Sequence, residues 1–167
     1  MQQDILNAID ETTDQLLAQI ALFSQEQFNK IPFEGSWTAA QVAEHIYKSE
    51  AGIPKLWQGN SIATTRPADE KVGILKSIFL DYTTKLKSPD FILPSDGVQR
   101  VEKLYDAIQS NRAIIRDLAA IIDLNLTFTG AAFPQLGELT GIEWATFLIC
   151  HSKRHTLQLQ HIFTKVK

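Results

Sequence analysis

TGIEWATFLICHSKRHTLQLQHIFT, residues 140–164, is the stretch of sequence that decides the fold. Its apolar side chains and two of its histidines recur at steps of three and four, which places them on one face of a helix. The members of this face are Trp144, Leu148, His151, His155, Leu159 and Ile162. Thr140 with Glu143 three residues later is the capping-box pattern, so we predict a helix from about residue 140 to residue 164.

Three segments nearer the N-terminus show the same helical period and predict long amphipathic helices. Thr38 and Gln41 form a second capping-box pattern at the start of the middle one, which should end near Trp57. The predicted helices cover about residues 3–28, 38–57 and 97–123. Four such helices predict an all-α fold, a four-helix bundle, within a single domain that spans residues 1–167.

The connection between the second and third helices is too long for a tight hairpin and predicts a crossover. A crossover allows these two helices to run in the same direction. Pro89 and Pro94 exclude a helix interior near its end. We therefore expect a loop over residues 58–68, a helix over 69–87 and an extended segment over 88–95.

The last connection, residues 124–139, is rich in Thr, Gly and Pro and is predicted to be a loop. The alternation of Leu124, Leu126 and Phe128 would also fit a short strand. Both interpretations stay open at this stage. No internal repeat or low-complexity tract interrupts the chain.

A third histidine, His45, lies on the apolar face of the second predicted helix. Imidazole is a common ligand for zinc, copper, iron and nickel. His151 and His155 already face one point, so His45 from a facing helix would complete a three-histidine metal site. Three protein ligands leave a coordination position open, which is the catalytic arrangement. The alternative is that these histidines are polar core residues that bind nothing.

The remaining histidine and the other polar side chains near this site have plainer interpretations. His161 is rotated off the face and is expected at the surface near a helix C-terminus. We interpret the following as solvated charge, although the first three could orient a histidine: Asp10, Glu11, Asp14, Glu44, Lys153 and Arg154. Ser49 fits packing or donation to a ligand, and Cys150 fits a buried thiol better than a fourth ligand or nucleophile. Core packing is the default for Trp37, Trp57 and Trp144, the last of which could wall the histidines.

Composition excludes several function classes. The formal net charge of -3, with scattered Lys and Arg, gives no basis for nucleic-acid binding. No apolar run reaches the length of a membrane span, and the amphipathic start does not resemble a signal peptide. The single cysteine, Cys150, cannot form an internal disulfide. We therefore expect a cytoplasmic protein with a small-molecule substrate and no membrane partner.

Several short motifs occur along the chain in a specific order. They are Trp37-Thr38, QVAEHI at residues 41–46, KLKSPDFILP at 85–94, FPQLGELTGIEW at 133–144 and HSKRH at 151–155. In this order they resemble motifs of the DinB-like superfamily of damage-inducible-type four-helix-bundle proteins, which includes bacillithiol S-transferases and mycothiol-dependent maleylpyruvate isomerases. The resemblance covers nearly the whole chain. Each motif is short, and their order and spacing together are more specific than any one of them.

The resemblance implies an up-down-down-up bundle that often dimerises and binds a divalent metal, frequently zinc or nickel. It implies that the ligands are His45, His151 and His155, all of which are present here. The reaction is not fixed by the resemblance. A metal-dependent enzyme could use a low-molecular-weight thiol as an S-transferase, or metal-bound hydroxide as a hydrolase. The alternative is a non-catalytic metal-binding protein of the stress response or one that binds a protein partner.

Overall fold

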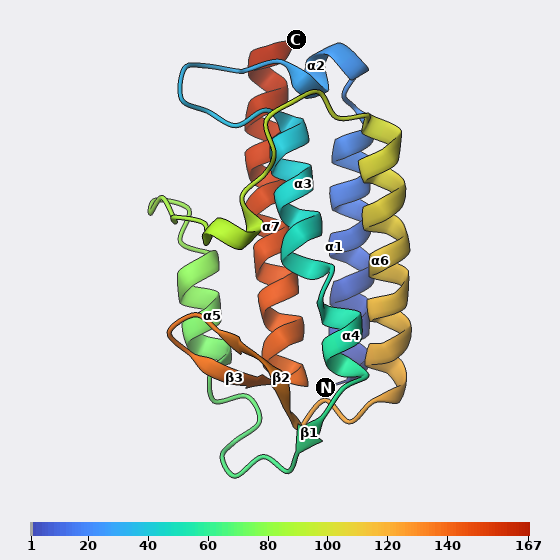
Figure 1. The fold of residues 1–167 in the computed structure, drawn as a ribbon, viewed down its shortest axis with the longest axis vertical. Coiled ribbons are helices and arrows are strands. Elements are labelled where there is room, and N and C mark those ends of the chain that lie inside the picture. The colour runs from blue at the N-terminus through green and yellow to red at the C-terminus, as the bar shows by residue number, and fades with distance from the viewer. Residues whose placement is uncertain (1) are drawn as a thin grey trace.

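The computed structural model describes residues 2–167, and most of them are helical (Figure 1). The long helices are α1 (Gln2–Ala21), α3 (Ala39–Glu50), α6 (Val101–Ile121) and α7 (Gly141–Val166). α1 packs against α6 and α7, and α3 packs against the same two helices. The predicted helical bundle is therefore confirmed in its main feature, the side-by-side packing of long helices around an apolar core.

Both predicted capping boxes are present. Thr38 Oγ1 accepts a hydrogen bond from the Gln41 backbone N–H, and the Gln41 side chain accepts one from the Thr38 N–H. Thr140 and Glu143 make the same exchange at the start of α7. These bonds satisfy N–H groups that a helix start leaves without partners, which is why the sequence located both helix starts correctly.

The first two predicted helices are each broken, contrary to expectation. α1 ends at Ala21, and Ser24 caps a separate short helix, α2 (Gln25–Asn29), through a capping box with Gln27. The second helix ends at Glu50 and is followed by α4 (Ile53–Trp57). Pro54 explains this second break, because its ring and its missing N–H cannot continue a helix that arrives from Glu50.

The crossover between α4 and α6 contains less helix than predicted. α5 (Val72–Phe79) replaces the expected helix over residues 69–87, because the chain turns at Asp81, whose carboxylate accepts hydrogen bonds from Thr83 and Thr84. These bonds lower the pKa of Asp81 to about 2. A short 3-10 helix, η1 (Asp90–Ile92), lies within the segment expected to be extended. α6 begins at Val101 rather than at residue 97, where Gly97 has a φ of +135°.

A small antiparallel sheet lies at one end of the bundle, below α5 in Figure 1. Its strands are β1 (Ser61–Ile62), β2 (Thr127–Phe133) and β3 (Gly137–Thr140), in the order β1-β2-β3. Phe128 pairs with Ser61 on one side and with Leu139 on the other. The prediction of a loop over residues 124–139 is wrong, because β2 and β3 form there. The mostly helical character predicted for the fold is confirmed, and this small sheet adds to it. The alternative of a short strand near Phe128 agrees with the position of β2.

The core consists of two apolar clusters with a polar layer between them. One cluster includes Ile9, Ile115 and Leu148, and the other includes Leu16, Ile108 and Leu159. Each long helix places polar side chains at the level between the two clusters. These buried side chains are Thr12, Glu50, Arg112, His151, Ser152 and His155. The candidate histidines on α7 therefore belong to a polar layer in the middle of the bundle.

A deeply buried ion pair between Glu50 and Arg112 belongs to this layer. The side chains are 1% and 0% exposed. Arg112 Nε and Nη2 each donate to one Glu50 oxygen at 2.6 Å, which links α3 to α6. Sequence patterning did not indicate this pair. Removing either partner alone would leave the other charge buried without a partner and would destabilise the fold.

Within residues 2–167, none of the helices has both the length and the apolar character that a membrane span requires.

Candidate metal centre

The three predicted histidines come together in the middle of the bundle. His45 lies on α3, and His151 and His155 lie one turn apart on α7. Their side chains are buried, with 3%, 3% and 8% of each residue exposed, respectively. The Nε2 atoms of His45 and His155 each lie 3.1 Å from Nε2 of His151. Three imidazole nitrogens therefore converge on one point, as the helix spacing predicted.

Hydrogen bonds at Nδ1 determine which nitrogen of two histidines carries the proton. His45 Nδ1 lies 3.0 Å from the backbone oxygen of Ile92, which can only accept, so Nδ1 must be the donor. His155 Nδ1 lies 2.7 Å from Oε1 of Gln158, which also accepts. In each neutral ring the Nε2 lone pair is therefore free. Both lone pairs face Nε2 of His151, an arrangement that a bound cation would stabilise.

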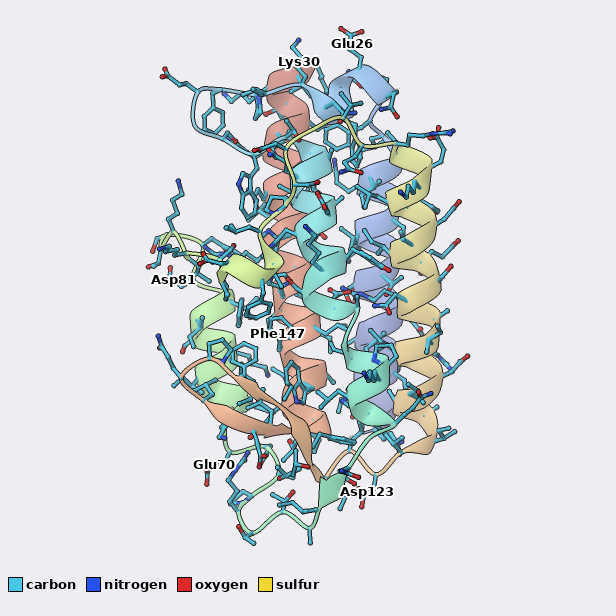
Figure 2. The ribbon with its side chains drawn as sticks, viewed as in Figure 1. Glu26, Lys30, Glu70, Asp81, Asp123 and Phe147 are labelled. Atoms are coloured by element: carbon cyan, nitrogen blue, oxygen red, sulfur yellow. The ribbon has the colours of Figure 1, made fainter. Side chains whose placement is uncertain are left out.

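His151 has a different environment from the other two histidines. Its Nδ1 is buried and has no hydrogen-bond partner among the described residues. Instead, aromatic rings surround it, with the ring centres of Phe147 at 5.0 Å and Phe79 at 5.7 Å. Figure 2 shows Phe147 between α5 and α7. These rings keep one side of the cluster apolar.

Burial keeps the three imidazoles neutral. It lowers the pKa of His45, which the hydrogen bond to Ile92 only partly offsets. Burial, followed by repulsion from the neighbouring histidines, lowers the pKa of His151 well below its ordinary value. Burial, followed by the repulsion that a protonated His45 would exert, lowers the pKa of His155 to about 3. Neutral imidazole is the form that binds metal ions, so the three side chains are in the state that coordination requires.

The donor set fits a divalent transition metal. Within residues 2–167, the grouped ligand atoms are the three imidazole nitrogens, all within 4.8 Å of one another, and no carboxylate or thiolate joins them. Nitrogen donors of this kind suit zinc, copper and nickel better than magnesium or calcium. Three ligands from the protein would leave at least one position for water or a substrate.

Most of the other candidates have the plain roles expected for them. Asp10, Glu11 and Asp14 are exposed on α1, outside the histidine group. Ser49 Oγ donates to the backbone oxygen of His45 at 2.7 Å, so this hydroxyl packs within its own helix. Cys150 is buried, and burial raises the pKa of its thiol. His161 and Lys153 are exposed, as predicted.

Two charged residues differ from the prediction of solvated charge. Glu44 is half-buried, and its carboxylate accepts hydrogen bonds from the backbone N–H and the hydroxyl of Ser95. The guanidinium of Arg154 donates to backbone oxygens of Phe79, Asp81 and Thr84 in the crossover. Helix spacing alone did not indicate these roles, because the partners lie in the crossover, far from Glu44 and Arg154 in the sequence.

Two of the three tryptophans lie near the histidine cluster, and the third packs in the core. The Trp37 ring lies 5.2 Å from the His45 ring, so it contacts a candidate ligand directly. Trp144 contacts Phe147, which in turn contacts His151. Trp144 was predicted to line the histidine cluster, but it is Phe147 that lies between Trp144 and His151. Trp57 packs in the core near Phe128.

Gln158 and Ile92 are the functional groups that sequence reasoning missed. Gln158 follows His155 by three residues on α7, a spacing that could have identified it as a neighbour of the ring. The Ile92 oxygen is a backbone atom from a segment 47 residues away from His45. No side-chain pattern could have indicated that contact.

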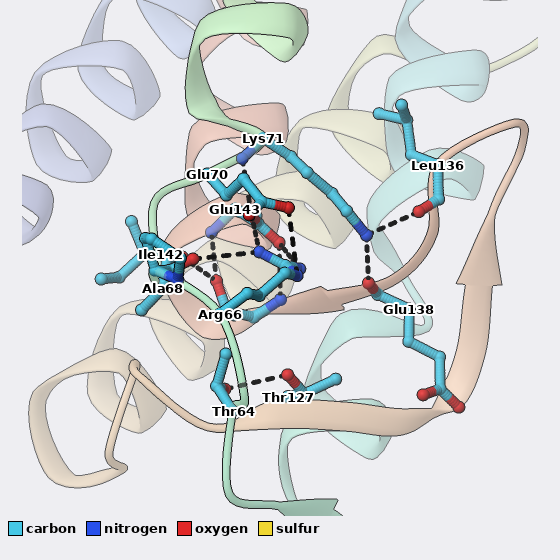
Figure 3. Close-up of polar contacts among 12 residues, drawn as sticks. Thr64, Arg66, Ala68, Glu70, Lys71, Thr127, Leu136, Glu138, Ile142 and Glu143 are labelled. Atoms are coloured by element: carbon cyan, nitrogen blue, oxygen red, sulfur yellow. Dashed lines mark hydrogen bonds and ion pairs between the residues drawn. The ribbon is translucent and has the colours of Figure 1, made fainter.

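A second polar cluster, shown in Figure 3, fixes the crossover to the start of α7. The side chain of Glu143 is fully buried and accepts two hydrogen bonds from the Arg66 guanidinium, at 2.6 and 2.7 Å. It also accepts one from the Lys71 backbone N–H at 2.8 Å. Lys71 Nζ donates to the backbone oxygens of Leu136 and Glu138 in the hairpin. Sequence analysis identified Glu143 only as a capping residue.

Fold and site together define a class: a helical bundle with a buried cluster of three histidines contributed by two of its helices. The sequence profile described as the DinB superfamily matches residues 8–159, and the chain belongs to that superfamily. The resemblance seen in the sequence motifs is thereby confirmed. No curated protein and no solved structure shows significant similarity to the chain.

Proposed function

We propose that His45, His151 and His155 bind one divalent metal ion, zinc or nickel, and that the resulting centre is catalytic. The observation that carries this proposal is the convergence of three Nε2 atoms, two with lone pairs freed by the hydrogen bonds at Nδ1. Buried lone pairs that face one another are costly without a shared proton or a cation. A metal ion would satisfy all three at once.

A bound ion would act as a Lewis acid and would lower the pKa of a water or thiol at its open position. The residues of the chain hold and shield that position. The Ile92 oxygen and Gln158 orient two of the rings. Phe79, Phe147 and Trp37 place apolar surface beside His45 and His151, which would limit the access of water. Exclusion of water strengthens electrostatic effects at the centre.

Thiol transfer suits this centre better than hydrolysis. In the transfer reaction, the sulfur of a low-molecular-weight thiol forms a bond to an electrophilic carbon, and the leaving group departs with the bonding electron pair. The thiol proton passes to solvent. Hydrolysis would need a general base beside the attacking water. The histidine group contains no carboxylate among residues 2–167, and its aromatic surroundings suit an apolar electrophile.

A non-catalytic metal-binding protein is the second candidate. The observation that favours it is the deep burial of the three histidines, of which none is more than 8% exposed. A metal in so enclosed a place could serve as a staple between α3 and α7. Binding of a thiol to the loaded centre separates the two candidates. Cobalt-substituted protein should develop a sulfur-to-cobalt absorption band with a small thiol if the centre is open, and no such band if it is closed.

The metal site itself is tested by two histidine variants on the same helix. His155→Ala removes one ligand and should lower bound zinc or nickel sharply, because two imidazoles hold such an ion weakly. His161→Ala is the matched control, since this exposed histidine lies outside the cluster, and it should retain the wild-type metal content. Elemental analysis of protein purified without chelator gives the answer. Equal metal content in both variants would refute the assignment.

The proposal includes the up-down-down-up order of the four long helices. In Figure 1, α3 and α6 both begin at the end of the bundle where α2 lies, while α1 and α7 begin at the opposite end, which supports this order. A crossover is then needed to bring the chain back along the bundle before α6. In this protein the crossover passes His45 on the way.

A further inference from the structure

The crossover includes a strap, residues 80–95, that is fastened to the two helices that supply the histidines. On α7, Arg154 precedes His155 and donates to Asp81 O at 2.7 Å and to Thr84 O. On α3, Glu44 precedes His45 and accepts two hydrogen bonds from Ser95. The neighbours of two candidate ligands therefore hold opposite ends of the strap.

Between these fastenings, the strap touches a candidate ligand directly. The Ile92 backbone oxygen accepts the hydrogen bond from His45 Nδ1 at 3.0 Å. Lys48 Nζ donates to the next backbone oxygen, that of Leu93, at 2.9 Å, and pairs with Glu44 Oε1 at 3.0 Å. Position and tautomer of His45 thus depend on where the strap lies. The Ile92 carbonyl can hold the His45 ring only while the strap is docked.

We propose that Glu44 is a positioning residue for the metal centre, acting through Ser95 to dock the strap so that the Ile92 oxygen orients His45; this proposal rests on the proposed metal site. Partners that hold the second nitrogen of a metal-binding histidine typically change metal affinity ten- to a hundredfold when removed. Glu44 acts one step further away, by fixing the segment that carries the partner. Docking of the strap and binding of metal should therefore favour one another.

The surroundings of Glu44 show that its carboxylate is engaged. Burial alone would raise the pKa of Glu44, but hydrogen bonds from Lys48 and Ser95 outweigh it and lower the pKa below its ordinary value. Two exposed lysines, Lys85 and Lys87, lie between the fastenings and offer a direct measure of docking. Trypsin should reach them when the strap is released.

Zinc affinity of three variants tests the proposal, measured by competition with a chromogenic chelator. Glu44→Ala should raise the zinc dissociation constant about tenfold, by lowering the fraction of molecules with a docked strap. Glu11→Ala removes the same type of side chain from an exposed position on α1 and should leave the constant within about twofold of wild type. Glu44→Gln keeps an oxygen for Ser95 and should recover most of the lost affinity.

A second readout follows the strap itself. Zinc should slow tryptic cleavage after Lys85 and Lys87 in the wild-type protein, and Glu44→Ala should speed it in the absence of metal. Circular dichroism checks that the variants remain helical. Equal zinc dissociation constants for Glu44→Ala and Glu11→Ala would overturn the positioning role of Glu44 but not the metal site. Tryptic cleavage of the wild-type protein at a rate that zinc does not change would do the same. A Glu44→Gln variant as weak as Glu44→Ala would overturn the part of the proposal that assigns docking to the hydrogen bonds with Ser95. Wild-type protein that takes up no zinc would overturn the metal site as well.

Discussion

Single residues divide into those that a helical pattern reveals and those that it cannot. His45, His151 and His155 were found because each lies on an apolar face at a step of three or four. Glu50 and Arg112 were not found, because a buried charged pair breaks the rule that such residues face solvent. The contact of the Ile92 oxygen with His45 could not be predicted, because any residue supplies a backbone carbonyl and no side-chain pattern indicates its position.

A substitution at Glu143 can separate the contribution of its negative charge to stability from that of its capping hydrogen bonds. Glu143→Gln retains the capping-box geometry but loses the ion pair with Arg66. Because Arg66 keeps about a fifth of its side chain exposed and can regain water, we expect a loss of about 1.5 to 3 kcal/mol in the free energy of unfolding at pH 7. Urea denaturation measures this loss. Glu138→Gln, an exposed change in the same hairpin, is the control and should cost little.

The difference in the free energy of unfolding between the wild-type protein and Glu143→Gln should depend on pH. Burial tends to raise the pKa of Glu143, but hydrogen bonds from Arg66 and from two backbone N–H groups outweigh this and lower it below the ordinary value of 4.5. A lowered pKa in the folded state stabilises the fold above pH 4.5, and this contribution is lost as the pH falls through the folded-state pKa. The difference between wild type and Glu143→Gln should therefore shrink in acid. A difference that stays constant from pH 7 to pH 3 would contradict the ionised role of Glu143.

The boundaries of helices and strands were predicted best where hydrogen bonds between residues close in the sequence determine them. The two predicted capping boxes, at Thr38 and Thr140, fix their helix starts, and the sequence located them. The breaks at Ser24 and Pro54 also have local signals, but the continuing apolar period across them suggested unbroken helices. The hairpin of β2 and β3 was harder, because its short strands bury only a few side chains and give a weak alternating pattern.

The junction between the α6–β2 loop and α7 depends on one glycine. A Cβ added at Gly141 would lie 2.8 Å from both the Cα and the Cδ2 of Leu124, so the two segments could not pack as closely. We expect Gly141→Ala to cost about 1 to 3 kcal/mol in the free energy of unfolding. Gly73→Ala on α5 meets no atom within 4 Å and should leave stability unchanged or raise it by up to about 1 kcal/mol. Equal effects of the two changes in urea denaturation would show that the junction tolerates a larger residue.

The whole molecule is a helical bundle with a buried polar layer between its two apolar clusters. Composition and periodicity predicted the helical bundle, because four broad apolar faces can be buried only against one another. The small sheet and the path of the strap depend on contacts between distant segments, which a single sequence does not reveal. The expected homodimer, the absence of a nucleic-acid partner and the cytoplasmic location stay predictions.

Zinc K-edge X-ray absorption of zinc-loaded wild-type protein, free of added thiol, tests the central claim most directly. An open three-histidine centre predicts about one zinc per chain, with three imidazole nitrogens at about 2.0 to 2.1 Å and a further light atom that is not part of an imidazole. Failure to take up zinc, or spectra without imidazole scattering, would contradict the claim. A sulfur neighbour at about 2.3 Å would also contradict it, because Cys150 would then have to be a ligand and the position would be closed.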